Sequence, residues 1–296
     1  MKKKRIQLKH WLVLPAIIIM LSVMIFPLLF SLRTSFYYYI ISKPTYRPFI
    51  WFANYLNMLK DGQVLNSIVV TLKIAIRAVI IEFIVGFIIA HFLSKIPRYQ
   101  NFLLSVLIMP MMLSSIAVGM MWRLLLNPDL GIVNYLLTQI GIKAYPWLAL
   151  PKTALPTIVF VEVWRSTPFV ALMLYSGIIS LPVEPFESAT IDGANAWQKF
   201  YYLTLPLLQP IILVLVTIRA INLIKLYDLI FIMTHGGPGD TTETISHYIW
   251  RVGFTDLDLG KASAGSWIIV IFISILTTFL FNRLFKIGSK TQKTKG

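Results

Sequence analysis

Glu187-Ser-Ala-Thr-Ile-Asp-Gly-Ala-Asn-Ala-Trp-Gln-Lys-Phe-Tyr-Tyr-Leu-Thr-Leu-Pro206 is a polar, helix-prone stretch in a chain that is mostly apolar. It lies between two long apolar segments, at about residues 154–181 and 207–233. A membrane protein that keeps an amphipathic segment of this length between two spans offers a docking surface outside the hydrocarbon region. The stretch therefore decides which class of membrane protein this is.

The composition places the chain in a lipid bilayer. Of its 296 residues, 57% are hydrophobic and only 13% are charged, more apolar surface than one soluble core could bury. A bilayer core of about 30 Å needs about 20 apolar residues per helix, and the runs do not alternate as barrel strands do. The sequence predicts an all-α integral membrane protein, with residues 1–296 forming one transmembrane domain. Its six spans are expected at about 11–32, 66–93, 102–126, 154–181, 207–233 and 264–286.

The net charge of +15 is arranged as a topology signal. Thirteen basic residues fall in the two tails and in the loops after the second and fourth apolar runs, against eight in the opposite loops. Because basic residues concentrate on the cytoplasmic side, both termini and the loop 182–206 are expected there. The basic residues flank the bilayer, which favours anionic headgroups over nucleic acid as their partner. The first apolar run is long and lacks a cleavage site, so we interpret it as a retained span and not as a signal peptide.

Several kinds of chemistry have no matching motif. The chain has no cysteine, and His91, His235 and His247 are scattered without metal-ligand spacing, so no metal site is predicted. Gly236-Gly-Pro-Gly-Asp240 lacks the Lys-Ser/Thr ending of a phosphate-binding loop. We therefore predict that the chain does not hydrolyse ATP and is not an enzyme.

The local pattern of the polar stretch predicts two short helices. Residues 186–194 suit the first helix, with Glu187 in the first turn, where a carboxylate complements the helix dipole. Gly193 can adopt a left-handed conformation and let the chain reverse. Residues 196–203 suit the second helix, which places three aromatic side chains on one face. An interfacial helix lying on the membrane is the alternative interpretation.

The full pattern resembles the EAA loop of ABC importer permease subunits. Glu187-Ser-Ala189 is followed after three residues by Gly193 and then by Leu203-Thr-Leu205-Pro206, with Ser188 where that motif usually has alanine. The similarity covers nearly the whole chain and points to the carbohydrate-uptake branch. Its further fragments are Leu14-Pro-Ala, Phe26-Pro-Leu-Leu, Asn54-Tyr, Asn66-Ser with Thr71, Leu181-Pro, Tyr227-Asp-Leu, Gly236-Gly-Pro-Gly239 and Thr242-Glu-Thr.

The resemblance implies a type I ABC importer (MetI-like) fold in a bacterial or archaeal cytoplasmic membrane. It also implies a second permease subunit, related but different in sequence, two cytoplasmic ATPases and an extracytoplasmic solute-binding protein. ATP and magnesium would be bound by the partner ATPase, and this chain would bind no cofactor. Trp197 and Phe200 would anchor the loop to this subunit. The ATPase contact carries over to Glu187, Ala189, Ile191, Asp192, Gly193 and Ala194.

Charged residues within the spans are the second signal, because each costs about 2.5–3.5 kcal/mol in the bilayer centre unless it is paired or hydrated. Arg219, Asn222, Lys225 and Asp228 recur every three residues, near one face of the fifth span. We predict that they line the substrate pathway. The alternative is that Lys225 and Asp228 pair with each other or with a partner subunit.

Other polar and aromatic residues of the spans have two interpretations each. Glu162 and Arg165 lie one turn apart and are expected to form a buried structural pair. Aromatic side chains of the fourth span could stack on sugar rings or could pack in the ordinary way. We include Trp164 and Tyr175 in the predicted pathway. The remaining candidates are Phe169 for an aromatic face and Lys73, Arg77 and Glu82 for the subunit interior or an interface.

These observations favour the membrane subunit of an ATP-driven importer for a sugar or oligosaccharide. With Arg283 and Lys286 counted in the C-terminal tail, six basic residues stand against three acidic ones in the spans, an excess that allows an acidic substrate. One alternative is an ABC permease for another small polar solute, such as an amino acid or phosphate. A second is an ion-coupled secondary transporter that uses Glu82, Glu162 and Asp228, and a third is a membrane receptor or scaffold.

Overall fold

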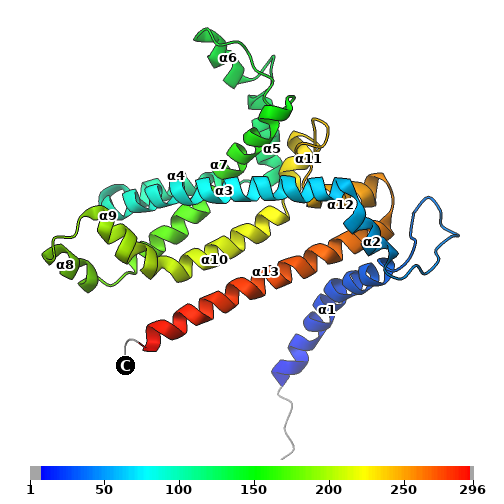
Figure 1. Cartoon of the computed structure of the whole chain (residues 1–296), viewed down its shortest axis with the longest axis horizontal. Coiled ribbons are helices and arrows are strands. Elements are labelled where there is room, and N and C mark those ends of the chain that lie inside the picture. Colours follow the sequence, from blue (N-terminus) through cyan, green and yellow to red (C-terminus); the bar gives the residue numbers. More distant parts are fainter. Residues whose placement is uncertain (1–7, 294–296) are drawn as a thin grey trace, which may run out of the picture. The chain divides into compact units, whose positions relative to one another are not determined.

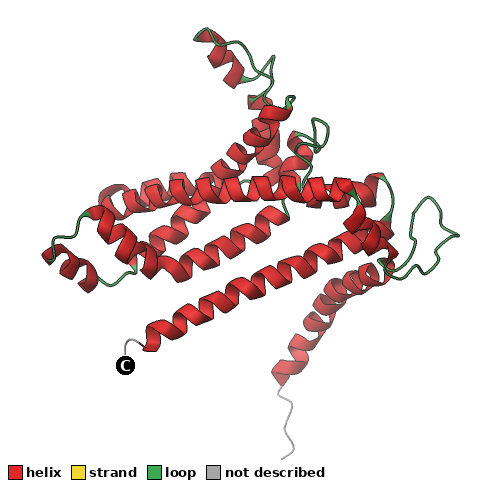
Figure 2. Cartoon of the chain, viewed as in Figure 1, coloured by secondary structure: helices red, strands yellow, loops and turns green. Residues whose placement is uncertain are grey.

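The computed structural model describes residues 8–293, with side chains described for residues 13–96 and 98–282. The side chains of the two basic tails lie outside this part. Every regular element of the described chain is helical (Figures 1 and 2). The longer helices are α1 (Leu8–Thr34), α3 (Gly62–Lys95), α4 (Gln100–Met112), α5 (Ser115–Leu125), α7 (Pro151–Ile179), α10 (Leu205–Ile224) and α13 (Leu259–Lys293). The shorter α-helices are α2 (Ala53–Lys60), α6 (Ile132–Gln139), α8 (Glu184–Ile191), α9 (Ala196–Lys199), α11 (Asp228–Met233) and α12 (Ile245–Trp250).

Four helices are long and apolar enough to cross a membrane: Val13–Thr34, Pro151–Ile179, Ala196–Ile224 and Leu259–Asn282. The bent pair of α4 and α5 adds a fifth if the two helices form one span. The 34 residues of α3 occupy the position expected for the second span. The count of six spans stays a prediction.

The chain forms two compact units. One contains the chain up to Asp61 together with Ile249–Phe272, and the other contains Gly62–Tyr248 and the chain from Ile273. Within the first unit, the Asn54 amide donates to the carbonyls of Ser35 and Tyr37, at 2.9 Å each, and fastens α2 to the end of α1. The prediction of one domain over the whole chain stays a prediction.

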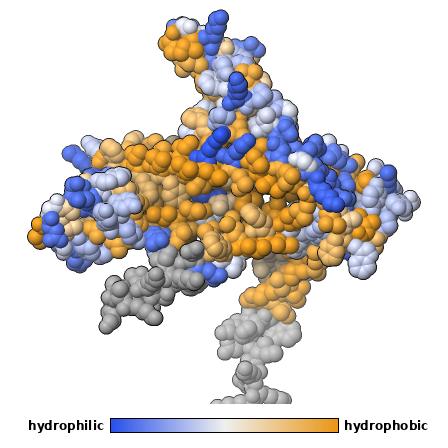
Figure 3. All heavy atoms as spheres, viewed as in Figure 1, coloured by the Kyte–Doolittle hydropathy of each residue, from blue (hydrophilic) through white to orange (hydrophobic). Residues whose placement is uncertain are grey.

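The second unit is built on the packing of α3 against α7, with α10 and α4 beside α7. Gly86 of α3 permits the close approach, since a Cβ there would lie 3.0 Å from Cγ1 of Val170. Val70, Ile74 and Ile158 belong to the buried core between these helices. Apolar side chains cover the face of the long helices in Figure 3, and hydrophilic ones gather around α8 and α9.

Two of the predicted spans are not continuous helices. The span expected at 102–126 consists of α4 and α5, which meet at 92°. The Ser114 hydroxyl accepts from the Ala117 amide at 3.2 Å and caps the new helix, which explains the bend locally. The span expected at 207–233 ends as a regular helix at Ile224, and a separate helix, α11, begins at Asp228.

Candidate functional site

The break between α10 and α11 leaves backbone carbonyls that the helix no longer pairs. Two hydroxyls from the segment before and within α12 supply the missing donors. The Thr244 hydroxyl donates to the carbonyl of Leu226 at 2.7 Å, and the Ser246 hydroxyl donates to that of Ile224 at 2.9 Å. Because these buried carbonyls are satisfied, the chain can leave the helix here, and Lys225, Tyr227 and Asp228 take fixed positions.

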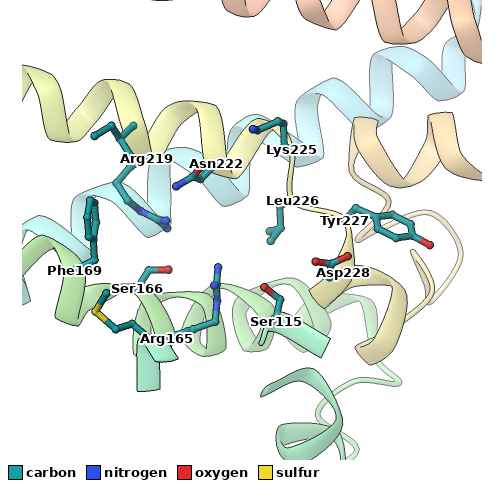
Figure 4. A pocket seen from close by; sticks show the side chains of 12 residues that line it. Ser115, Arg165, Ser166, Phe169, Arg219, Asn222, Lys225, Leu226, Tyr227 and Asp228 are labelled. Atoms are coloured by element: carbon teal, nitrogen blue, oxygen red, sulfur yellow. The ribbon is translucent and has the colours of Figure 1, made fainter. Parts of the chain in front are cut away.

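A cavity of about 510 Å³ lies beside this break. In Figure 4, Arg165 and Ser166 of α7 face Arg219 and Asn222 of α10 across the cavity. The lining mixes amide, hydroxyl, ammonium, guanidinium and carboxylate groups with apolar and aromatic side chains. Its full set is Met111, Ser115, Arg165, Ser166, Phe169, Ile218, Arg219, Asn222, Lys225, Leu226, Tyr227 and Asp228.

Behind the cavity, a buried ionic network joins three helices. Arg219 of α10 makes two bonds of 2.7 Å to the Glu82 carboxylate of α3 and one of 2.7 Å to Glu162 of α7. Glu162 also pairs with Arg165 at 2.9 Å and accepts from the Ser166 hydroxyl at 2.9 Å. Arg219, Glu82 and Glu162 are 3%, 0% and 1% exposed, so the network is shielded from water. Two guanidinium groups and two carboxylates neutralise one another in it.

The predicted pathway residues divide between this cavity and the packed interior. The cavity is lined by all four polar residues predicted from the fifth span: Arg219, Asn222, Lys225 and Asp228. Arg219 and Asn222 belong to α10, Lys225 follows its end, and Asp228 begins α11. Within the described part of the chain, Lys225 and Asp228 form no ion pair with each other. Their role in transport stays a prediction.

Trp164 and Tyr175 lie outside the lining of this cavity. The Trp164 ring packs edge-on against Trp122, with centroids 5.5 Å apart, next to the core between α3 and α7. The Tyr175 side chain is buried, and its hydroxyl accepts from the Gln100 side chain. Both environments are those of ordinary packing residues.

The sequence interpretation missed several lining residues, among them Ser115, Ser166 and Tyr227. Ser166 follows Arg165 directly, so the helical spacing that revealed the Glu162–Arg165 pair also places its hydroxyl one turn from Glu162. Ser115 reaches the cavity only because of the 92° bend, which no residue spacing revealed. Within the described residues, no group of three or more His, Asp or Glu side chains could hold a metal ion.

At the other end of the second unit, the polar stretch folds as a helix-turn-helix. Helix α8 ends in a Schellman motif. The Gly193 amide donates to the carbonyl of Thr190, and the Ala194 amide donates to the carbonyl of Ala189. Gly193 has φ of +76°, the left-handed conformation that this motif requires. Asn195 then caps α9 in a reciprocal pair with Gln198, at 2.9 and 2.8 Å. The first predicted helix and the turn at Gly193 are found, with α8 at Glu184–Ile191. The second predicted helix is not separate, because α9 continues through a π-helical turn at Phe200–Thr204 into α10, so residues 196–224 form one long helix.

The outer face of this loop is open and its inner face is anchored. Glu187 and Asp192 are exposed, and the Ile191 side chain is 87% exposed. Phe200 packs edge-on against Phe87 of α3, with centroids 5.7 Å apart, which fastens the loop to the long helices. Trp197 rests on Phe200 but stays 71% exposed.

A known protein family matches most of the chain. The family described as "Binding-protein-dependent transport system inner membrane component" matches residues 82–292. The chain belongs to this family. It is a permease chain of a multi-pass inner-membrane transport system and is not an enzyme.

Two relatives align with this permease over nearly its whole length. It is 37% identical to the probable ABC transporter permease protein y4oQ of Sinorhizobium fredii, over 96% of this chain and 92% of that protein. It is 29% identical to the trehalose/maltose transport system permease protein MalF of Thermococcus litoralis, over 94% of this chain and 93% of that one.

The fold of the permease is also found in a solved structure. A chain of a bacterial ABC transporter that imports the acidic polysaccharide alginate aligns with a TM-score of 0.80. The alignment covers 95% of this chain and 96% of that one, at 22% identity. The predicted ABC importer permease fold is therefore confirmed.

Proposed function

We propose that this chain is a membrane-spanning permease subunit of an ATP-driven sugar importer, and that the cavity between α7 and α10 belongs to its substrate pathway. The cavity carries the proposal, because it gathers polar groups from four helices, α5, α7, α10 and α11, at a break in a membrane helix. Interrupted helices at membrane depth are tolerated where they line a cavity and often form transporter binding sites. The trehalose/maltose permease relative supports a sugar as the substrate.

The chemistry of the lining suits a polyhydroxylated ligand. Sugar hydroxyls both donate and accept hydrogen bonds, and Asn222 offers both functions through its amide. Lys225 adds a donor and Asp228 an acceptor. Phe169 adds an aromatic face that can cover the C–H-rich face of a sugar ring.

The charges around the cavity favour a neutral sugar over an acidic one. Arg165 and Arg219 are neutralised by Glu162 and Glu82 directly behind them, and Lys225 is matched by Asp228 on the same lining. The excess of positive charge in the spans therefore does not lie on this cavity. The solved alginate transporter, by contrast, imports an acidic polysaccharide. Competition for uptake by neutral and acidic oligosaccharides separates the two classes.

For the other end of the molecule, we propose that α8 docks on a separate ATPase subunit, which binds ATP and magnesium. The open face of α8, with Glu187 and Ile191 exposed, supports a partner on this side. An apolar side chain that is 87% exposed next to a carboxylate is a combination that protein interfaces commonly bury. A solute-binding protein would deliver the sugar from the opposite side, as the family description implies.

An Asn222→Leu variant should assemble normally and take up sugar at least about tenfold more slowly. Leucine removes the amide and leaves the hydroxyls of a passing sugar without a partner, which costs about 1–3 kcal/mol per lost bond. The measurement is uptake of radiolabelled sugars by the assembled transporter in proteoliposomes. Gln209→Leu is the matched control, because Gln209 is an exposed amide on α10 outside the cavity. Equal uptake by the two variants would remove the cavity from the pathway.

The proposed topology predicts a pattern of thiol labelling. The chain has no native cysteine, so single cysteines at Lys3, Asn195, Asp240 and Lys293 report without background. A membrane-impermeant maleimide should label only the Asp240 position in intact cells and all four after permeabilisation. Labelling of the Asn195 position from outside would overturn both the topology and the docking proposal.

A further inference from the structure

Helix α3 carries two basic side chains in the middle of an exposed apolar stripe. Lys73 and Arg77 are exposed, one turn apart, on the side of α3 away from its buried ladder. The stripe around them is formed by Val69, Ile76, Ile80 and Ile84, which are 45%, 58%, 53% and 58% exposed. An apolar helix stripe of this kind is either a lipid-facing or a helix-packing surface.

Lipid is a poor environment for these two charges. Arg77 lies within three residues of the middle of the expected span 66–93, so about 11 Å of a roughly 30 Å hydrocarbon core separates its backbone from the outer headgroups. That distance exceeds what an arginine side chain can cover by reaching toward the headgroups. A charge left in hydrocarbon costs about 2.5–3.5 kcal/mol, so the pair requires a counter-charge or water.

The chain itself has no carboxylate to offer them. It contains 12 acidic residues, of which only Glu82, Glu162 and Asp228 fall within the expected spans. Glu82 and Glu162 are held by Arg219 and Arg165, and Asp228 lines the cavity beside Lys225. In the part of the chain that the structure describes, neither Lys73 nor Arg77 forms an ion pair.

We propose that this stripe, residues 69–84 of α3, packs against a transmembrane helix of a second, different permease chain that carries carboxylates opposite Lys73 and Arg77. The inference rests on the proposed function and on the second permease subunit that the EAA-loop resemblance implies. A second copy of the same chain does not fit. In a second copy, Glu82 and Glu162 are held by arginines and Asp228 lines the cavity, as in the first, so the copy would add basic side chains at membrane depth without a free counter-charge.

Site-specific photo-crosslinking tests which molecule covers the stripe. A photoreactive phenylalanine is placed at Ile80, on the stripe, in the full transporter expressed with an epitope-tagged second permease chain. The matched control position is Ile68, which is 38% exposed, lies outside residues 69–84 and points about 120° away from Ile80 around the helix. We expect an adduct with the tagged chain from the Ile80 position and at least about tenfold less from the Ile68 position. An adduct with a second copy, with lipid alone or with no chain overturns the proposal.

Charge variants test the chemistry of the contact. Lys73→Met with Arg77→Met leaves the partner's carboxylates unpaired, so co-purification of the second chain should fall about tenfold or more. Lys73→Arg with Arg77→Lys keeps both charges and should retain the second chain, which separates charge from packing. A methionine double variant that keeps its partner but loses uptake would assign the stripe to an aqueous route and overturn the proposal. Uptake by the wild-type complex tests the proposed function separately.

Discussion

An Arg219→Met variant should lose about 3–5 kcal/mol of stability, the largest effect expected of any single substitution in this chain. Arg219 makes three charged bonds of 2.7 Å to Glu82 and Glu162, and neither carboxylate is more than 1% exposed. Methionine fills a similar volume but leaves the buried Glu82 carboxylate without an ion-pair partner, while Glu162 keeps only Arg165 and Ser166. Thermal unfolding of the purified transporter in detergent, followed by intrinsic fluorescence, measures the loss.

Two comparison variants show whether the charge or the volume of the Arg219 side chain is responsible for the loss of stability. Arg165→Met removes an arginine that is 20% exposed and bound only to Glu162, so the loss should be clearly smaller. Adding Glu82→Gln to Arg219→Met removes the stranded charge, keeps the Glu162–Arg165 pair and should recover much of the stability. A double variant no more stable than Arg219→Met alone would show that the side-chain volume of Arg219, and not its charge, holds the helices together.

This ionic network contains one contact that the sequence predicts, Glu162–Arg165, and one that it does not, Glu82–Arg219. Glu162 and Arg165 lie three residues apart on one helix, so their spacing was sufficient to predict the pair. Glu82 and Arg219 are separated by 137 residues on different helices. Their contact depends on how α3 and α10 rotate against α7, which is set by close packing at positions such as Gly86. The spacing of residues within one helix does not reveal how α3 and α10 rotate against α7.

The break in the fifth expected span has the same origin. Hydrophobicity and helical spacing continue through Lys225, so the sequence predicts one helix to residue 233. The helix ends at Ile224 because hydroxyls 18 and 22 residues later, on Thr244 and Ser246, bind the carbonyls that it leaves free. The four polar residues expected on one stripe still line one cavity, since the break turns Asp228 back toward α10. By contrast, the first helix and the glycine turn of the loop after α7 were predictable, because they depend on residues close together in the sequence.

A Glu187→Lys variant should insert normally and lose most sugar uptake, by at least about tenfold. Glu187 is exposed and forms no ion pair within the described residues, so reversing its charge should change the stability of this chain little. A large loss of transport would therefore come from a contact with another subunit. Reversing a charge that is paired across an interface commonly costs 2–5 kcal/mol of binding free energy. Sugar-stimulated ATP hydrolysis and uptake, measured together in proteoliposomes, report the coupling.

Matched controls for this loop distinguish the contact from the fold. Glu184→Lys reverses the other exposed acid of α8 one turn earlier, and it should transport better than Glu187→Lys if the contact is specific. Gly193→Pro should abolish coupling, because proline cannot adopt φ of +76° and lacks the amide that binds the carbonyl of Thr190. Gly193→Asn should keep most activity, since asparagine tolerates the left-handed conformation and no atom lies within 4 Å of the added Cβ. Wild-type uptake and ATP hydrolysis in both Glu187→Lys and Gly193→Pro would rule out α8 as the element that transmits ATP-driven motion to the long helices.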